Sequence, residues 1–338
     1  MNRISGRAVT LASVAERAGV SKITASRALR QGSLVAEATR QRVMTAVADL
    51  SYSPNLLARG LAQNRTATLG VVVLELDNPF FALMLSGIQA VAAKRGFLVV
   101  VGESSREEEE ERRYVLQFQQ LRIGGIIVSP FMKRLDHLVA ARAGGTPVVV
   151  MARRWKEGDY VAADDRKGGW LVAQHLLIRG HRRIGLVRRR DPNHTPIRAR
   201  VLGFRKTLAA AGIQVPEEWD LQLEGGLIED GMKAADQILR MAEQPSALFV
   251  TSDRMALGVV YRLMEQGIMV PQDVAIVGYN GIPYAESARV PLTTVAIPMQ
   301  RLGEESAEII FSRLDGAAPD WPRQVLLPPE LVIRASCP

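Results

Sequence analysis

Apolar positions near the N-terminus follow the spacing of two short helices. Within residues 11–18 they recur every three or four residues, which predicts a helix with one buried face. Gly19 then provides a turn where a side chain would hinder a left-handed backbone. Ser21 is suited to cap a second helix. The inner faces of the two helices consist of Leu11, Val14, Ala15, Ala18, Ala25, Ala28 and Leu29.

The outer face of the second helix is polar and basic. Lys22, Ile23, Ser26 and Arg27 share it, because positions 0, 1, 4 and 5 fall together at 3.6 residues per turn. A helix with such a face fits the major groove of DNA. The alternative for this segment alone is an ordinary helical hairpin with a solvated face.

Net charge is concentrated at the same end of the chain. Residues 1–65 contain ten Arg and Lys and three Asp and Glu, a balance of +7 out of +8 for the whole chain. The remaining residues carry 33 basic and 32 acidic side chains and are near neutral. A basic module on a neutral body indicates phosphate contacts at one end. A generic basic tail would not also carry a foldable apolar pattern.

Two further helical patterns follow. Residues 37–50 predict a third helix that closes the small N-terminal core. Residues 56–64 predict a short helix that Asn55 can cap. Gly60 lowers the stability of this helix, and a helix of barely two turns is only marginally stable in water. We therefore expect this segment to order only when something packs on it. A plain interdomain tether is the alternative.

From residue 68 onward, strand patterns alternate with helix patterns. Such alternation predicts parallel sheets with crossover helices, and its restart after residue 168 predicts two lobes with a cleft at the carboxyl ends of the strands. The expected strands are 69–74, 97–101, 125–129, 148–151, 160–163, 183–187, 220–223, 247–250 and 273–279. The expected helices are 81–95, 113–121, 135–143, 168–178, 200–211, 230–242 and 256–266.

Composition limits the class of protein. No run of about 18 uncharged apolar residues and no apolar leader are present, so we expect a cytoplasmic protein without membrane contact. Cys337 is the only cysteine, which rules out an internal disulfide. Phosphate-cradling glycine motifs are missing, and the four histidines lack metal-site spacing. We therefore expect neither cofactor, nor metal, nor catalytic site, and treat Glu107–Glu111 as a solvated first turn of a helix.

A series of short motifs resembles the lactose-repressor (LacI/GalR) family of bacterial transcription regulators over essentially the full length. Their order and spacing make the resemblance specific. The matching segments are 9–29, 39–40, 52–55, 57–59, Leu61, 70–73, 77–81, 125–128, 180–184, 252–258, 277–279, 291–295, 302–303 and 331–334.

This resemblance implies a small all-α helix-turn-helix headpiece and a hinge helix. An α/β two-lobed core with parallel sheets, like that of periplasmic binding proteins, is implied to follow. The implied bounds are 1–53 for the headpiece, 54–66 for the hinge and 67–338 for the core. Three crossings between lobes are implied, with 67–165 and 295–325 in the first lobe and 166–294 and 326–338 in the second.

The resemblance also assigns roles in binding a near-palindromic operator. Arg27 would read a guanine edge, and Ile23 a thymine methyl. Arg30 replaces a common Asn and would add a phosphate contact, whereas Ala36 lacks the serine cap common there. Leu61 would wedge into the minor groove. The full set of DNA-binding candidates is Ser21, Lys22, Ile23, Ser26, Arg27, Arg30, Thr39, Asn55, Arg59 and Leu61.

The effector site is inferred in the same way. Arg200 matches the arginine with which the family grips its ligand. Asn280 and Ala152 stand where carboxylates are common, which favours an anionic effector such as a sugar acid or sugar phosphate over a neutral sugar. The alternative is that Asp253 or Asp164 neutralises the arginines from within. The candidates are Phe80, Phe81, Ser104, Ser129, Arg153, Arg198, Arg200, Ser252, Asp253 and Asn280.

Together these features predict a transcription regulator that acts as a repressor. Its affinity for DNA is expected to be controlled by a small sugar-like effector. We expect a homodimer, because one recognition helix reads only a few base pairs and a two-fold dimer doubles that readout. The last residues show no leucine heptads of the sort that join dimers into tetramers. The alternative from another class is a small-molecule binding or processing protein whose N-terminal module serves protein contacts.

Overall fold

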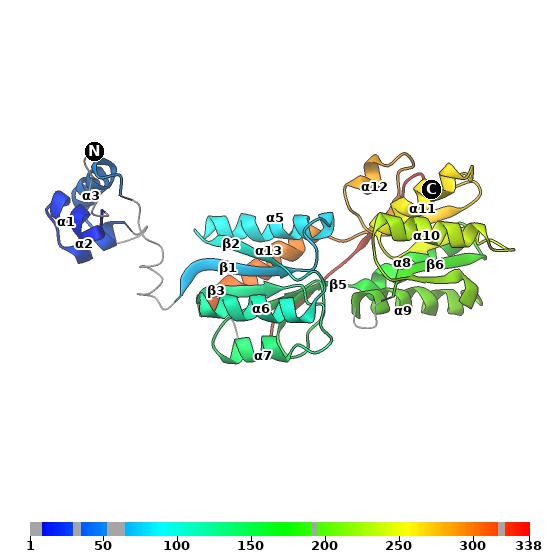
Figure 1. The fold of residues 1–338 in the computed structure, drawn as a ribbon, viewed down its shortest axis with the longest axis horizontal. Coiled ribbons are helices and arrows are strands. Elements are labelled where there is room, and N and C mark those ends of the chain that lie inside the picture. The colour runs from blue at the N-terminus through cyan, green and yellow to red at the C-terminus, as the bar shows by residue number, and fades with distance from the viewer. Residues whose placement is uncertain (1–8, 30–34, 53–64, 191–194, 317–321) are drawn as a thin grey trace, which may run out of the picture. The chain divides into compact units, whose positions relative to one another are not determined.

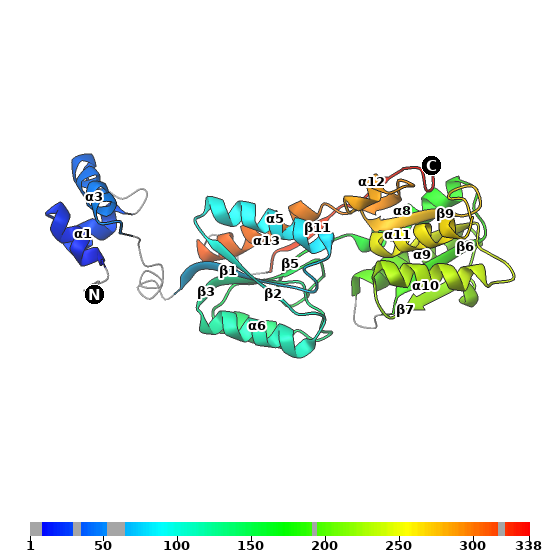
Figure 2. The same ribbon diagram turned by 45° about the horizontal axis from the view of Figure 1, so that its top comes forward.

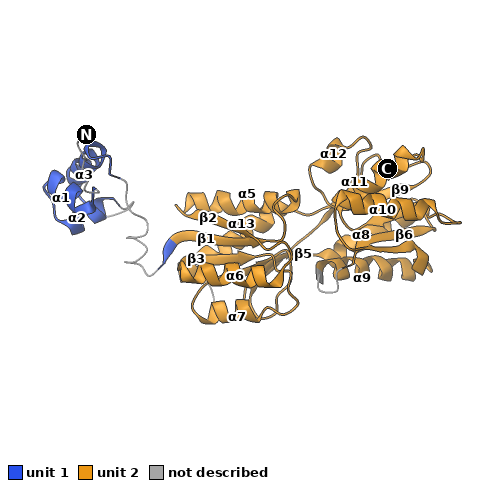
Figure 3. Cartoon of the chain, in the orientation of Figure 1, with its two compact units in different colours: residues 1–66 blue, residues 67–338 orange. Residues whose placement is uncertain are grey.

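The chain divides into two compact units, residues 1–66 and 67–338 (Figure 3). The computed structural model describes residues 9–29, 35–52, 65–190, 195–316 and 322–338. Each unit has its own hydrophobic core and is described separately.

The first unit is built from three helices. They are α1 (Leu11–Ala18), α2 (Lys22–Ala28) and α3 (Glu37–Asp49). Val14, Ala25 and Val43, one from each helix, are fully buried against one another in its core. The small size of the alanines on α1 and α2 lets the two helices approach closely around the tight turn.

Local caps fix the ends of these helices. Thr10 and Ser13 form a capping box at the start of α1, and Gly19 ends the helix with φ at 64°. The Ser21 hydroxyl accepts a hydrogen bond of 3.1 Å from the Thr24 amide at the start of α2. At the start of α3, Ala36 provides no side-chain cap, as the missing serine implies.

The second unit contains two six-stranded sheets, one in each lobe (Figures 1 and 2). In the first lobe the strand order is β11-β5-β4-β3-β1-β2. Its strands are β1 (Thr66–Val73), β2 (Leu98–Glu103), β3 (Ile123–Val128), β4 (Val148–Met151), β5 (Asp159–Ala163) and β11 (Gln324–Leu327). Its helices are α5 (Pro79–Lys94), α6 (Glu108–Gln120), α7 (Asp136–Ala143) and α13 (Met299–Leu314).

In the second lobe the strand order is β12-β10-β9-β8-β6-β7. Its strands are β6 (Ile184–Arg189), β7 (Asp220–Leu223), β8 (Ala247–Val250), β9 (Ala275–Asn280), β10 (Thr293–Ala296) and β12 (Glu330–Val332). Its helices are α8 (Asp165–Ile178), α9 (Thr195–Ala210), the short 3₁₀ helix η1 (Glu217–Trp219), α10 (Ile228–Leu239), α11 (Asp253–Glu265) and α12 (Tyr284–Ser287). β10 pairs antiparallel with β12 and parallel with β9.

Helices cover both faces of each sheet, as parallel sheets with crossovers require. In the first lobe α5 and α13 lie on one face and α6 and α7 on the other (Figure 1). Glycines let paired helices approach closely: a Cβ at Gly169 of α8 would overlap the carbonyl oxygen of Arg200 on α9. No helix in the described ranges is long and apolar enough to cross a membrane.

The chain passes between the lobes after β5, after β10 and after β11. The sequence analysis expects the chain to return to the first lobe from about residue 295, which is two residues too early. Val295 and Ala296 still pair with Tyr279 and Asn280 of β9, which keeps β10 in the second lobe through Ala296. At the last crossing, Leu327 still pairs with Ala163 of the first lobe, so β11 extends beyond the expected limit of residue 325.

Candidate functional site

The outer face of α2 presents the residues expected to contact DNA. Lys22, Ile23, Ser26 and Arg27 line one shallow surface depression together with Leu11 of α1. Ile23 is an aliphatic side chain 67% exposed to solvent, so it is accessible for an apolar contact. Lys22 and Arg27 are exposed beside it, so this surface combines positive charge with one apolar contact.

The other candidates for DNA contact fall into two groups. Ser21 is exposed, and its hydroxyl is already engaged as the cap of α2. Thr39 lies in the first turn of α3 and is partly exposed. The candidates Arg30, Asn55, Arg59 and Leu61 lie outside the described residues.

A cavity opens between the two lobes, at the carboxyl ends of their strands. Its apolar walls include Phe80 and Phe81, whose rings meet edge to face with centroids 5.2 Å apart. Its lining carries four arginines and two carboxylates. These are Arg106, Arg153, Arg189, Arg200, Glu75 and Asp165.

Arg200 is held rigidly at the wall of this cavity. Its Nη2 donates to Asp165 Oδ1 at 2.8 Å, and its Nε donates to the same oxygen at 3.2 Å. Its Nη1 donates to the Thr251 carbonyl, and the guanidinium lies 3.4 Å from the centre of the Tyr279 ring. Tyr279 also donates its hydroxyl to Asp165 Oδ1 at 3.1 Å. Arg200 is therefore neutralised and oriented before any ligand enters.

Burial dominates the electrostatics of this cluster. It raises the pKa of the Asp165 carboxyl, and the positive charge of Arg200 opposes that rise. Burial, followed by the negative charge of Asp165, raises the pKa of the Tyr279 hydroxyl well above its ordinary value. Tyr279 is therefore a permanent hydrogen-bond donor in this site.

Arg153 anchors the neighbouring loop. It is buried, and its guanidinium donates to the carbonyls of Met132 and Lys133, at 3.1 Å for the latter. The carboxylate of Glu111 accepts the Phe131 amide at 2.8 Å and is fully buried, so the expectation of a solvated turn over Glu107–Glu111 is wrong at Glu111. These bonds fix the segment next to Ser129, which lines the cavity.

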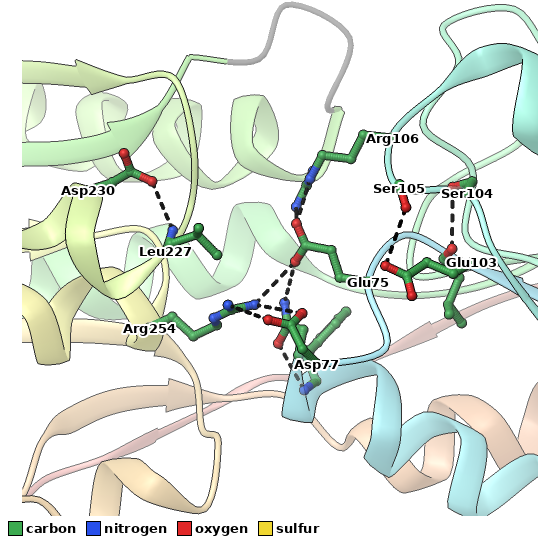
Figure 4. Close-up of polar contacts among 12 residues, drawn as sticks. Glu75, Asp77, Glu103, Ser104, Ser105, Arg106, Leu227, Asp230 and Arg254 are labelled. Carbon is green, nitrogen blue, oxygen red and sulfur yellow. Dashed lines mark hydrogen bonds and ion pairs between the residues drawn. The ribbon is translucent and has the colours of Figure 1, made fainter.

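A second charged cluster lies at the edge of the cavity and joins the lobes (Figure 4). Arg254, at the start of α11 in the second lobe, forms ion pairs with Glu75 at 3.3 Å and with Asp77 at 2.9 Å, both from the loop after β1. Arg106, from the loop after β2, pairs with the same Glu75 at 2.6 Å.

Seven of the ten effector candidates line the cavity. They are Phe80, Phe81, Ser129, Arg153, Arg200, Ser252 and Asn280. Asn280 ends β9 with φ at 118°, a conformation that asparagine tolerates better than most residues.

Three candidates lie elsewhere among the described residues. Arg198 is exposed, because two positions along α9 turn it about 200° away from Arg200. Ser104 is fully buried, and its hydroxyl donates to the Val73 carbonyl at 3.3 Å. Asp253 is fully buried and has a positioning role: its Oδ2 accepts the amides of Gly281 at 2.6 Å and Ile282 at 2.9 Å.

The internal acid that balances Arg200 is Asp165, and neither Asp253 nor Asp164 takes that role. Asp164 instead caps α8 by accepting the Lys167 amide at 3.2 Å. Sequence reasoning also missed Glu75, Arg106 and Arg189 as lining residues. All three follow or end strands at the carboxyl edge of a sheet, which is the signal that could have found them.

Comparisons with known proteins agree with this architecture. Residues 10–55 match the family described as bacterial regulatory proteins, lacI family, and residues 173–337 match a periplasmic binding protein-like domain. The chain is 33% identical over 334 residues to the HTH-type transcriptional repressor PurR of Photobacterium profundum, covering 97% of this chain and 98% of that protein. It is 33% identical over 310 residues to the repressor of the same name from Vibrio cholerae (strain M66-2), covering 90% and 91%.

Solved structures give the same result. The lac repressor dimer bound to operator and the anti-inducer ONPF aligns with a TM-score of 0.86 at 28% identity, over 98% of this chain and 99% of that one. The transcriptional regulator CelR in complex with cellobiose aligns with a TM-score of 0.72 at 30% identity, over 97% and 99%.

Proposed function

The chain belongs to the LacI family of bacterial regulatory proteins, and we propose that it acts as a homodimer controlled by an anionic, polyhydroxylated effector. As a member of this family it is a DNA-binding transcription regulator governed by a small molecule, not an enzyme. The observation that carries the proposed effector class is the lining of the interlobe cavity, with four arginines against two carboxylates.

The charge of the lining favours an anion for a physical reason. Positive charges in a partly desolvated cavity repel one another, and a ligand that brings negative charge relieves this repulsion. Arginine also matches carboxylate and phosphate oxygens with two parallel hydrogen bonds. The Phe80 and Phe81 rings offer an apolar wall, while Ser129, Ser252 and Asn280 supply short polar groups suited to hydroxyls.

A thermal-shift and calorimetric screen tests the effector class. The panel contains neutral sugars, their carboxylate and phosphate analogues, and nucleobases, each assayed with the full-length protein. Binding raises the melting temperature by mass action, so an anionic sugar should stabilise the protein more than its neutral parent. Tight binding of a neutral sugar, without response to its anionic analogues, would refute the proposal.

On DNA, we propose that α2 enters the major groove of each half-site. Lys22, Ile23 and Arg27 would contact base edges, Ser21, Thr39 and Arg30 phosphates, and Leu61 the minor groove at the centre of the site. The basic, exposed face of α2 supports this arrangement. Leu61→Ala should remove most of the operator bend in fluorescence-based measurements, whereas an unchanged bend angle would contradict a wedge role.

The homodimer has support from the sheet edge of the first lobe. β2 is an edge strand, and Leu98, Val100 and Val101 on it are exposed. An exposed apolar edge strand is a liability in a monomer, so a second copy of the chain is the proposed cover. Sedimentation equilibrium at micromolar protein should give the mass of a dimer. A monomer, or a stable tetramer, would contradict this part of the proposal.

A further inference from the structure

Arg106 occupies an unusual position beside the cavity. It lies in the loop between β2 and α6, where Ser105 and Arg106 have φ values of 48° and 65°. Two consecutive residues other than glycine in the left-handed region are strained, and such strain tends to occur at functional sites. The strained turn directs the Arg106 side chain toward Glu75 at the cavity wall (Figure 4).

The guanidinium of Arg106 is only partly used. Its Nε donates to Glu75 Oε1 at 2.7 Å, and its Nη2 lies 2.6 Å from the same oxygen. Its Nη1 is buried and has no hydrogen-bond partner in the part of the chain that the structure describes. A buried N–H without an acceptor is unfavourable. The Arg106 side chain as a whole is 24% exposed and lines the cavity, so a small rotation of the guanidinium would bring Nη1 to an oxygen atom of a ligand.

Glu75 connects this arginine to the opposite lobe. While Oε1 accepts from Arg106, Oε2 lies 3.3 Å from Arg254 Nη1 and also accepts from Asn78 Nδ2 at 3.2 Å. Arg254 is not among the cavity-lining residues of the described chain, and its Nη2 donates to Asp77 at 2.9 Å. One carboxylate is therefore shared between a cavity arginine and an arginine that bridges the lobes.

We propose that Arg106 binds the anionic group of the effector through Nη1, and that Glu75 couples this contact to Arg254 so that anion binding and lobe closure strengthen each other. This inference rests on the proposed function, in which the effector is an anion. It assigns Arg106 as a specificity-determining residue and Glu75 and Arg254 as coupling residues.

The charges of the cluster explain the coupling. Arg106 and Arg254 are balanced by Glu75 and Asp77 in the arrangement described above. An anion beside Arg106 adds negative charge close to Glu75, and this addition is favourable only while Arg254 remains near. Closure of the second lobe onto the first keeps Arg254 there. By linkage, an anion that binds the closed arrangement better shifts the lobes toward it.

Isothermal titration of the full-length protein tests the proposal with three probes: inorganic phosphate, gluconate and its neutral counterpart glucose. Arg106→Gln should weaken binding of the anions by roughly tenfold or more. Arg254→Gln should weaken it by roughly fivefold or more, although Arg254 does not line the cavity. In the double variant the fold-loss of anion affinity should be smaller than the product of the two single fold-losses, because both arginines act through Glu75.

Two further variants keep the result interpretable. Arg112→Gln removes one positive charge from an exposed position on α6 and should leave anion binding unchanged. Arg106→Lys keeps the charge but loses the planar fork, and should give an intermediate affinity. Thermal unfolding of each variant identifies any that fails to fold.

The outcomes separate this inference from the proposed function. If anions bind the parent and Arg106→Gln alike, or if the two single losses simply multiply in the double variant, the coupling is wrong and an anionic effector stands. If glucose binds and neither anion does, the proposed effector class fails. If no probe binds the parent protein, the inference is overturned for these anions.

Discussion

Replacing Asp165 by asparagine isolates the internal neutralisation of Arg200. The substitution keeps the size of the side chain and one carbonyl oxygen, which can still accept from Arg200 and Tyr279. It removes the negative charge that balances a guanidinium only 5% exposed to solvent. The structure therefore implies that the main effect of Asp165→Asn is an uncompensated buried charge.

The magnitude follows from the burial of the pair. Removing one partner of a buried ion pair costs about 3–5 kcal/mol, and the retained acceptor places this variant near the lower end, at about 3 kcal/mol. The unit spanning 67–338 has an unfolding entropy of about 0.57 kcal/mol per kelvin, at about 2.1 cal/mol/K for each residue. The expected fall in melting temperature is therefore about 5 °C.

Differential scanning calorimetry of Asp165→Asn and Asp164→Asn provides the measurement and its matched control. Asp164 is the adjacent residue, and asparagine caps a helix as well as aspartate does. Its ion pair with Arg154, at 3.6 Å, is largely exposed and contributes at most about 1 kcal/mol. The control should shift by less than about 2 °C. Equal shifts in the two variants would refute the assignment of Asp165 as the neutralising acid.

Three other expectations follow from the sequence and from the described residues. Arg27→Ala should lose about 1–3 kcal/mol of operator affinity and relax specificity, whereas Arg30→Ala should weaken all DNA alike and flatten the salt dependence; equal losses on operator and random DNA would contradict this division. Burial raises the pKa of Asp253 above its unfolded value of 3.8, so its contribution to stability is fully present in acid and falls as pH rises through the folded pKa. Asp253→Asn should abolish this loss of stability with rising pH. Urea unfolding between about pH 4 and about pH 7 should therefore show the free energy of unfolding rising more steeply with pH in the variant than in the parent. Burial also raises the pKa of the Cys337 thiol to about 11, so native protein at pH 8 should resist Ellman's reagent, whereas protein in guanidinium should react at once.

The local elements were predictable where the sequence carries strong signals. The turn at Gly19 and the cap at Ser21 placed α1 and α2, and the strand expected at 220–223 coincides with β7. Strand ends were harder, because β6 begins at Ile184 and continues through Arg188 and Arg189 despite their charge. A parallel strand that ends at a cavity can carry polar residues in its last positions, which hydropathy alone does not reveal. The segments after residue 293 could be assigned to lobes only through the family resemblance.

The cavity residues show a sharper limit of sequence reasoning. Asp164 and Asp165 are adjacent, and a strand would point them to opposite sides. In the structure Asp164 is the cap of α8 and Asp165 its first residue, so one faces the helix amides and the other faces Arg200. Which of two neighbouring acids reaches a buried arginine depends on where the helix starts. The cap at Asp164 sets that start, and the close approach of α8 and α9 at Gly169, a contact between distant parts of the chain, places α9 and its Arg200 beside α8.

This assignment changes how an anion would be recognised. Because Asp165 already balances Arg200, an anion held by Arg200 alone would leave the pair with excess negative charge. The other arginines of the lining are Arg106, which Glu75 already pairs, and Arg153 from the first lobe and Arg189 from the second. A ligand that contacts arginines of both lobes gains its full electrostatic stabilisation only when the lobes approach each other. The lining charge would thus give the proposed anionic effector a higher affinity for the closed core than for the open one, and a ligand needs such a difference in order to shift a regulator between two states.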